Sequence, residues 1–174
     1  MRIYAMSKRK FDAHMEANGI DDSNVESFPN LYLISIGYTF SLGADDALDK
    51  MAPHFKDNHR NVLNIAFDDV VVDMPYWDVA NKVELTSKAM TAEQARTIAD
   101  FVQNIEDEFL RNGKPTDDNE IIVHCHMGKS RSGAVAQFIA ERFWYDQDLL
   151  MKDNPQIEPN RTCLRLLRET QHRK

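Results

Sequence analysis

The stretch IIVHCHMGKSRSGAVAQFIAERF, residues 121–143, joins a strand pattern to a helix pattern through a short loop. Residues 121–124 form a short apolar run, as is typical of a strand buried in a parallel sheet. A helix is expected from about Ser130 to Trp144. Cys125, one of only two cysteines in the chain, comes directly after the strand. Because ligands of parallel sheets bind beyond the carboxyl ends of the strands, we expect a site around Cys125.

The rest of the chain also alternates between predicted strands and predicted helices. Strands are expected over residues 2–5, 31–36 and 61–67, and helices over 7–18, 44–55, 91–113, 146–152 and 160–171. Ser7 and Thr91 are expected to cap two of these helices, and the segment 70–90 is expected to form a loop or short pieces of structure. This order predicts an α/β fold with a central, mainly parallel sheet flanked by helices. At 174 residues, the chain is expected to form a single domain over residues 1–174.

The composition limits the classes of partner. Hydrophobic residues make up 43% of the chain and charged residues 28%, which is typical of a folded domain with a core. The formal net charge of −7 argues against a nucleic-acid binder or a membrane-surface binder, because both need a positive field. No apolar run is long enough to span a membrane and the N-terminal residues lack a secretory signal, so we expect a cytoplasmic protein. The acidic pairs are interpreted as solvated turns and helix starts: Asp21–Asp22, Asp45–Asp46 and Asp117–Asp118.

The residues after Cys125 have the composition of an anion-binding loop. Residues 126–131, here named the phosphate loop, contain Gly128, which lets the backbone turn so that its amides form a nest for a tetrahedral anion. These amides and the start of the following helix stabilise a thiolate. Arg131 adds a planar fork that matches two phosphate oxygens, and the hydroxyl of Ser132 can hydrogen-bond the sulfur. A thiolate beside such a cradle is suited to nucleophilic attack on phosphorus.

The segment HCHMGKSRSG, residues 124–133, resembles the signature of the cysteine-based protein tyrosine and dual-specificity phosphatases, which is His-Cys, five residues, Arg and then Ser or Thr. The Ser-Arg-Ser form is similar to the dual-specificity branch and its small bacterial and phage relatives. The resemblance implies that Cys125 attacks phosphorus and forms a phosphocysteine, and that Arg131 binds the phosphoryl oxygens. It also implies that Ser132 assists breakdown of the intermediate and that His124 supports the cysteine.

The family also needs an aspartic acid that protonates the leaving oxygen and later activates water. Aligning Ile65 with the isoleucine of the family's earlier strand puts Asp69 at the acid position, with Asp68 beside it as a supporting residue. The connection from this strand to the phosphate loop is longer than in a typical member. Asp68, Asp73 and Asp78 therefore stay open as alternative acids.

The family implies that phosphate is bound by the loop residues His126, Met127, Gly128, Lys129, Ser130 and Arg131. A phosphorylated protein is the favoured substrate, and another phosphomonoester is the alternative. Lys129 makes the loop similar to phosphoinositide-directed members, so a phosphoinositide or inositol phosphate phosphatase stays open, as does a catalytically weak phosphate-binding module. Adjacent His124, Cys125 and His126 point in alternating directions along a strand, and the sequence has no second Cys/His cluster, so neither a metal nor a cofactor is expected.

Three further features have two interpretations each. Cys163 is expected to be a packed residue of the last helix, and the alternative is that it is a redox partner of Cys125. Asn160 either caps the last helix or, as in similar small phosphatases, braces the phosphate loop. Tyr76 and Trp77 either pack on the domain or form one wall of the site.

Overall fold

The computed structural model describes residues 1–39, 54–78, 82–113 and 115–171. Its main sheet has four parallel strands in the order β1-β6-β2-β3, which are β1 Arg2–Ser7, β6 Glu120–Cys125, β2 Leu31–Gly37 and β3 Val62–Ala66. The register sets Ser7 opposite Cys125 and Gly37 opposite Ala66, so the carboxyl ends of the strands lie at one edge of the sheet. The predicted α/β fold with a central parallel sheet is confirmed.

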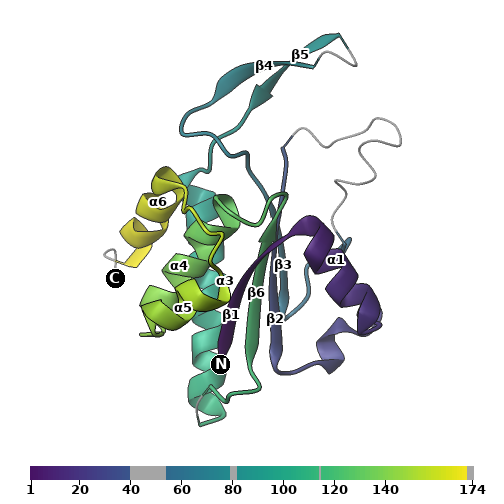
Figure 1. Ribbon diagram of the computed structural model, residues 1–174, viewed down its shortest axis with the longest axis vertical. Coiled ribbons are helices and arrows are strands. Elements are labelled where there is room, and N and C mark those ends of the chain that lie inside the picture. Colours follow the sequence, from purple (N-terminus) through teal and green to yellow (C-terminus); the bar gives the residue numbers. More distant parts are fainter. Residues whose placement is uncertain (40–53, 79–81, 114, 172–174) are drawn as a thin grey trace.

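Helices cover both faces of this sheet (Figure 1). Helix α1, Lys8–Ala17, lies on one face, where Phe11 packs in a cluster with Ile122. The other face carries α3 Ala92–Arg111, α4 Arg131–Arg142, α5 Gln147–Asp153 and α6 Arg161–Gln171. Apolar residues of these four helices form the larger core with strand residues such as Val123. None of the described helices is long and apolar enough to cross a membrane.

The strands predicted over residues 2–5, 31–36 and 61–67, and the helices predicted over 7–18, 91–113, 146–152 and 160–171, are present with ends close to the predicted positions. Ser7 and Thr91 cap α1 and α3 as predicted, because each hydroxyl accepts a hydrogen bond from the backbone N–H three residues further on. In α3 the cap is reciprocal, since the Gln94 side chain accepts from the Thr91 amide at 2.9 Å. Of the helix expected over residues 44–55, residues 44–53 lie outside the described residues, and the last two are not helical.

The segment 70–90 contains a two-stranded antiparallel hairpin of β4, Met74–Asp78, and β5, Val83–Ser87. Short pieces of structure were one of the two expectations for this segment, and the hairpin fulfils it. The hairpin projects away from the main sheet (Figure 1). Pro75 fits an edge strand such as β4, because proline has no N–H to donate to a strand ladder.

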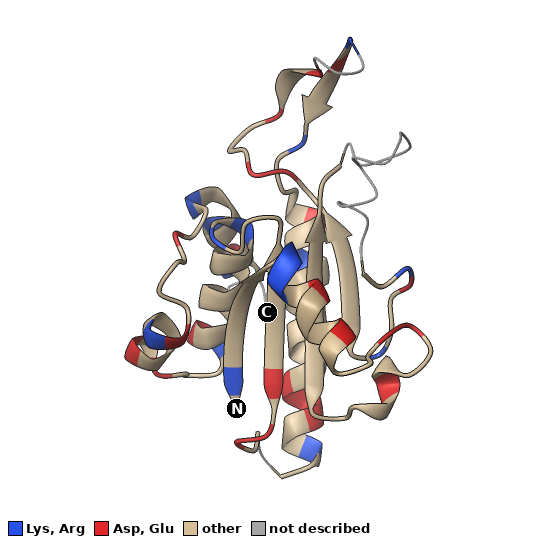
Figure 2. Cartoon of the chain, turned by 45° about the vertical axis from the view of Figure 1, so that its right-hand side comes forward, with Lys and Arg blue, Asp and Glu red and all other residues tan. Residues whose placement is uncertain are grey.

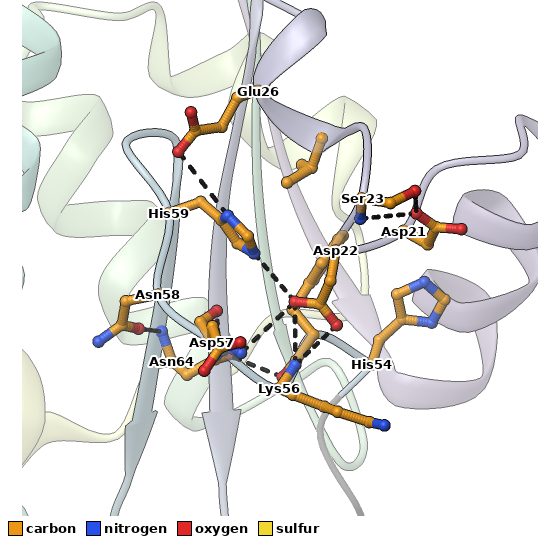
Figure 3. A network of polar contacts seen from close by, with 12 residues as sticks. Asp21, Asp22, Ser23, Glu26, His54, Lys56, Asp57, Asn58, His59 and Asn64 are labelled. Atoms are coloured by element: carbon orange, nitrogen blue, oxygen red, sulfur yellow. Dashed lines mark hydrogen bonds and ion pairs between the residues drawn. The ribbon is translucent and has the colours of Figure 1, made fainter.

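A polar network fixes the chain that leads into β3 (Figure 3). The Asp22 carboxylate, close in sequence to the short 3-10 helix η1 (Val25–Ser27), accepts from the Lys56 amide at 3.0 Å and from His59 Nε2 at 2.9 Å. The other ring nitrogen of His59 lies 3.7 Å from a Glu26 carboxylate oxygen. Burial raises the pKa of Asp22, but these hydrogen bonds outweigh it and lower the pKa below its usual value. Asp22 lies in a turn, as predicted, and its carboxylate also organises the approach to β3.

Candidate active site

The phosphate loop follows the carboxyl end of β6, as predicted, and packs closely against the end of β1. Gly128 has a positive φ of 72°. A Cβ at this position would lie 2.3 Å from the Ser7 backbone nitrogen and 2.5 Å from the Met6 carbonyl carbon. Both the left-handed backbone and this close approach require glycine. The loop is therefore seated directly on the neighbouring strand.

Carbonyl groups of the phosphate loop are held by the chain around it. The Lys8 amide donates to the His126 carbonyl at 3.2 Å. Residues 156–160 supply three more donors. Gln156 Nε2 donates to the Gly128 carbonyl at 3.3 Å, the Glu158 amide donates to the Lys129 carbonyl at 3.3 Å, and the Asn160 amide donates to the Ser130 carbonyl at 3.1 Å. In a trans peptide the next N–H points opposite to the carbonyl, and the described chain has no cis peptide. The amides of four residues therefore turn away from these braces, which is the geometry expected of an anion nest: Met127, Lys129, Ser130 and Arg131.

Cys125 is the last residue of β6, and only 2% of its surface is exposed. Its Sγ lies 3.1 Å from Oγ of Ser132, which is the contact that the sequence predicts. Helix α4 begins at Arg131, so the positive end of its dipole is directed at the phosphate loop. The N-cap residue Ser130 does not use its hydroxyl to cap this helix. The first amides of α4 can therefore donate hydrogen bonds to an anion.

Arg131 is held across the carboxyl ends of two other strands. Its Nη1 donates to the Gly37 carbonyl at 2.9 Å and to the Phe67 carbonyl at 2.7 Å. Its guanidinium carbon lies 4.2 Å from the centre of the Tyr38 ring, in a cation–π contact. Its Nε is buried and has no hydrogen-bond partner among the described residues. Because a buried donor without a partner costs free energy, this N–H is suited to receive an anion.

Asp69, the predicted general acid, contacts the phosphate loop. Its Oδ1 accepts hydrogen bonds from Ser130 Oγ at 2.7 Å and from Asn160 Nδ2 at 2.9 Å. The carboxyl group is on an exposed residue, as access to a substrate requires. The Asn160 side chain also accepts from the Cys163 amide at 3.0 Å, at the start of α6. Asn160 therefore fits both of its interpretations, as a helix cap and as a brace of the loop.

The alternative aspartates are engaged elsewhere. Asp68 is 2% exposed and accepts a hydrogen bond from the Lys88 amide at 2.7 Å. Asp73 forms an ion pair with Lys88 at 2.8 Å, and the hydrogen bond from that side chain lowers the pKa of Asp73. Asp78 ends β4, towards the tip of the hairpin (Figure 1). These positions favour Asp69 as the acid and make Asp68 a clamp between β3 and the hairpin.

His124, predicted to support Cys125, lies on the opposite face of the sheet. Its ring stacks on Phe11 with 4.0 Å between the ring centroids, and neither ring nitrogen has a hydrogen-bond partner among the described residues. Burial, reinforced by the positive charge of Lys8 and of other nearby groups, lowers the pKa of His124 to about 3. The ring is therefore neutral. The ring packs under the end of β6 and forms no hydrogen bond to the Cys125 sulfur.

The remaining residues of the phosphate loop carry exposed side chains. Met127 is 62% exposed and its side chain has no hydrogen-bond donor, so its backbone amide is the group that can bind a phosphate. The exposed His126 ring lies 5.7 Å from the Tyr38 ring, and Lys129 is also exposed. The basic first turn of α1, residues 8–10, lies at the same end of the sheet (Figure 2). Cations therefore gather near the loop, although the chain has a net charge of −7.

Sequence analysis missed some residues of the site and found others. Gln156 and Glu158, which brace the phosphate loop, and Lys8, which holds its start, were not predicted. The sequence signal near the first two is the pair Pro155 and Pro159, which breaks the helical pattern there. Cys163, by contrast, is buried in α6 as predicted, and this burial raises the pKa of its thiol to about 12.

A cavity of about 530 Å³ lies elsewhere, beside the start of β2 and the second half of α3. Tyr32, Arg60 and Glu108 line it, and the Arg60 guanidinium is paired with the Glu108 carboxylate at 2.6 Å. Its lining includes none of the predicted site residues. We place the candidate site at the phosphate loop, where the chemical groups converge.

No protein-family model matches the chain, and no curated protein matches it. Among solved structures, it is similar to the human tyrosine phosphatase-like serine/threonine/tyrosine-interacting protein, with 18% identity, coverage of 87% of this chain and 88% of that chain, and a TM-score of 0.47. It is also similar to Tk-PTP in the active form, with 15% identity, coverage of 99% of this chain and 91% of that chain, and a TM-score of 0.43.

Proposed function

We propose that this protein is a phosphomonoesterase of the protein tyrosine and dual-specificity type, which hydrolyses phosphate esters through a phosphocysteine. One observation carries the proposal. Four groups lie at one edge of the sheet: the Cys125 sulfur, the amides of the phosphate loop, the buried Arg131 Nε and the Asp69 carboxyl. A nucleophile, an anion cradle and a proton donor are the three parts that this hydrolysis needs.

In the first step, the Cys125 thiolate attacks phosphorus and forms an S–P bond as the P–O bond to the leaving group breaks. Asp69, in its protonated form, gives its proton to the leaving oxygen. The amides of the phosphate loop and Arg131 hold the non-bridging oxygens, whose negative charge they stabilise in the transition state. The hydrogen bonds of Nη1 to two strand-end carbonyls orient the guanidinium before the substrate arrives.

In the second step, water attacks the phosphocysteine and the S–P bond breaks. Asp69, now ionised, takes a proton from that water, and inorganic phosphate leaves. The sulfur departs as a thiolate. Ser132, whose Oγ lies 3.1 Å from Sγ, donates a hydrogen bond to the developing negative charge.

Trapping the intermediate tests the proposal. Ser132→Ala removes the donor to the departing sulfur, so the variant is expected to accumulate phosphocysteine when it is mixed with an aryl phosphate and quenched with acid. Peptide mass spectrometry should place the phosphoryl group on Cys125. The same quench of Cys125→Ser should give no modified peptide. If neither wild type nor Ser132→Ala forms the adduct while substrate is consumed, the covalent route is wrong. Phosphate binding without turnover would indicate a binding module.

A further inference from the structure

The projecting hairpin exposes much of the apolar surface of the described chain. Eleven large hydrophobic residues are exposed among the described residues, and six of them lie between positions 71 and 83. These six are Val71, Val72, Met74, Tyr76, Trp77 and Val83, with exposures from 42% to 65%. Tyr76 and Trp77, which the sequence interprets either as packing on the domain or as one wall of the site, are 47% and 57% exposed on this hairpin. Contiguous exposed apolar patches mark sites where a partner binds.

The strand pairing sorts these side chains onto two faces. Residues that lie opposite each other in an antiparallel pair share a face, and alternate residues share a face along each strand. The register pairs Tyr76 with Leu85 and Asp78 with Val83, with Met74 at the other end of the same face. One face therefore carries four apolar residues, here named the apolar face: Met74, Tyr76, Val83 and Leu85. No described strand pairs with the outer edge of β4 or of β5.

The hairpin is tied to the candidate acid. Lys88, directly after β5, forms two hydrogen bonds with Asp68. The Lys88 amide donates to the Asp68 carboxylate at 2.7 Å, and the Lys88 carbonyl accepts from the Asp68 amide at 2.7 Å. Asp73, directly before β4, binds Lys88 Nζ at 2.8 Å. Both ends of the hairpin are thus fixed next to Asp69. The hairpin projects from the end of the main sheet at which the phosphate loop lies (Figure 1).

The charges of the hairpin favour a protein partner over a lipid surface. Its described strands and flanks carry three acidic residues, Asp73, Asp78 and Glu84, against two lysines, Lys82 and Lys88. The whole chain has a net charge of −7. An anionic membrane would repel such a surface, whereas binding of an apolar protein segment needs no positive field.

We propose that the apolar face of the hairpin binds an extended segment of a phosphorylated protein, with apolar residues flanking the phosphorylated residue, while the phosphate enters the phosphate loop. This inference rests on the proposed function and assigns its substrate class. An open strand edge offers main-chain hydrogen bonds to such a segment, and the apolar face selects its side chains. A two-stranded hairpin is only marginally stable alone, so a bound segment also stabilises it.

The test compares kcat/KM for three probes: p-nitrophenyl phosphate, a phosphopeptide with Val, Ile and Leu around the phosphorylated residue, and the same peptide with Gly and Ser instead. Each peptide is made with phosphotyrosine and with phosphothreonine. Wild type is expected to prefer the apolar peptide by about tenfold or more, the effect of one well-placed apolar contact. The double variant Met74→Thr/Val83→Thr should lose this preference and retain p-nitrophenyl phosphate hydrolysis. Both residues lie outside the core clusters, so the variant should fold.

Leu110→Thr is the matched control, because Leu110 is 74% exposed on α3 and lies far from the hairpin in sequence. This variant should behave as wild type with all three probes. Equal kcat/KM for the two peptides, or hydrolysis of neither, would overturn the inference while p-nitrophenyl phosphate hydrolysis still upheld the proposed function. Two other results would also overturn it. One is cosedimentation with phosphatidylcholine/phosphatidylserine vesicles that the double variant abolishes. The other is a dimer, seen by light scattering, that the double variant dissolves.

Discussion

His124 shows at the scale of one residue that the motif serves stability as well as chemistry. Its ring is buried on Phe11, and both ring nitrogens lack partners among the described residues. Cys125, the next residue, faces the other side of the sheet, in the larger core. The two residues of the His-Cys pair therefore lie on opposite faces of β6. The His124 side chain packs on Phe11, and the Cys125 side chain lies beside the phosphate loop.

The buried His124 predicts a pH dependence of stability. Its pKa is about 3 in the folded protein and 6.5 in an exposed chain, so only the unfolded state gains a proton between these values. The stabilisation is complete above pH 6.5 and falls by about 1.4 kcal/mol for each pH unit below it. His124→Phe keeps a stacked ring and removes the titration. Urea unfolding at pH 7.5 and pH 5.5 should show a smaller loss of stability for the variant than for wild type. Equal losses would contradict the account of His124.

Asp69 gives the second prediction at this scale. Asp69→Asn cannot give a proton to the leaving oxygen, so hydrolysis of alkyl phosphates should fall by about 100-fold or more, the usual contribution of a general acid. Hydrolysis of p-nitrophenyl phosphate should fall much less, because its leaving group needs no proton. Asp73→Asn is the control, since Asp73 pairs with Lys88, and it should show no dependence on the leaving group. Equal losses with both substrates in Asp69→Asn would show that Asp69 is not the acid.

At the scale of elements, the contact of the phosphate loop with β1 is the part most open to a direct test. A methyl group at Gly128 would meet the β1 backbone at 2.3 Å, so Gly128→Ala should displace the loop. Gly19→Ala is a matched control, because Gly19 also has a positive φ, of 63°, but nothing lies within 4 Å of its added Cβ. Both variants carry the backbone strain of alanine at positive φ, about 1–2 kcal/mol. Only Gly128→Ala should lose turnover and inhibition by inorganic phosphate. Similar activity of the two would contradict the seating of the loop on β1.

The elements also show which parts of the candidate site can be predicted from the sequence. Cys125, Arg131 and Ser132 were predictable because they lie within one strand–loop–helix unit, whose spacing fixes their geometry. Gln156 and Lys8 were not, because the contacts that brace the phosphate loop join segments far apart in the sequence. Periodicity describes one element at a time and does not encode such pairings. The hairpin strands were equally hard to predict, since they are short and exposed on both faces.

At the scale of the whole molecule, net charge and local charge have separate effects. The value of −7 describes the surface as a whole, whereas cations gather near the phosphate loop, and screening separates these fields within about 10 Å. The net charge argues against a nucleic-acid or membrane-surface binder but does not exclude an anionic substrate at a local site. A parallel sheet brings all its carboxyl ends to one edge, where the phosphate loop, the strand-end carbonyls that hold Arg131, and Asp69 meet.

The most direct test of the central claim is hydrolysis of p-nitrophenyl phosphate across pH with EDTA present, for wild type and Cys125→Ser. We predict turnover by wild type that EDTA does not reduce and that Cys125→Ser abolishes. Inorganic phosphate should still bind the variant, because its phosphate loop and Arg131 are intact. Turnover that survives in Cys125→Ser, or that EDTA removes, would contradict a phosphatase that works through this cysteine.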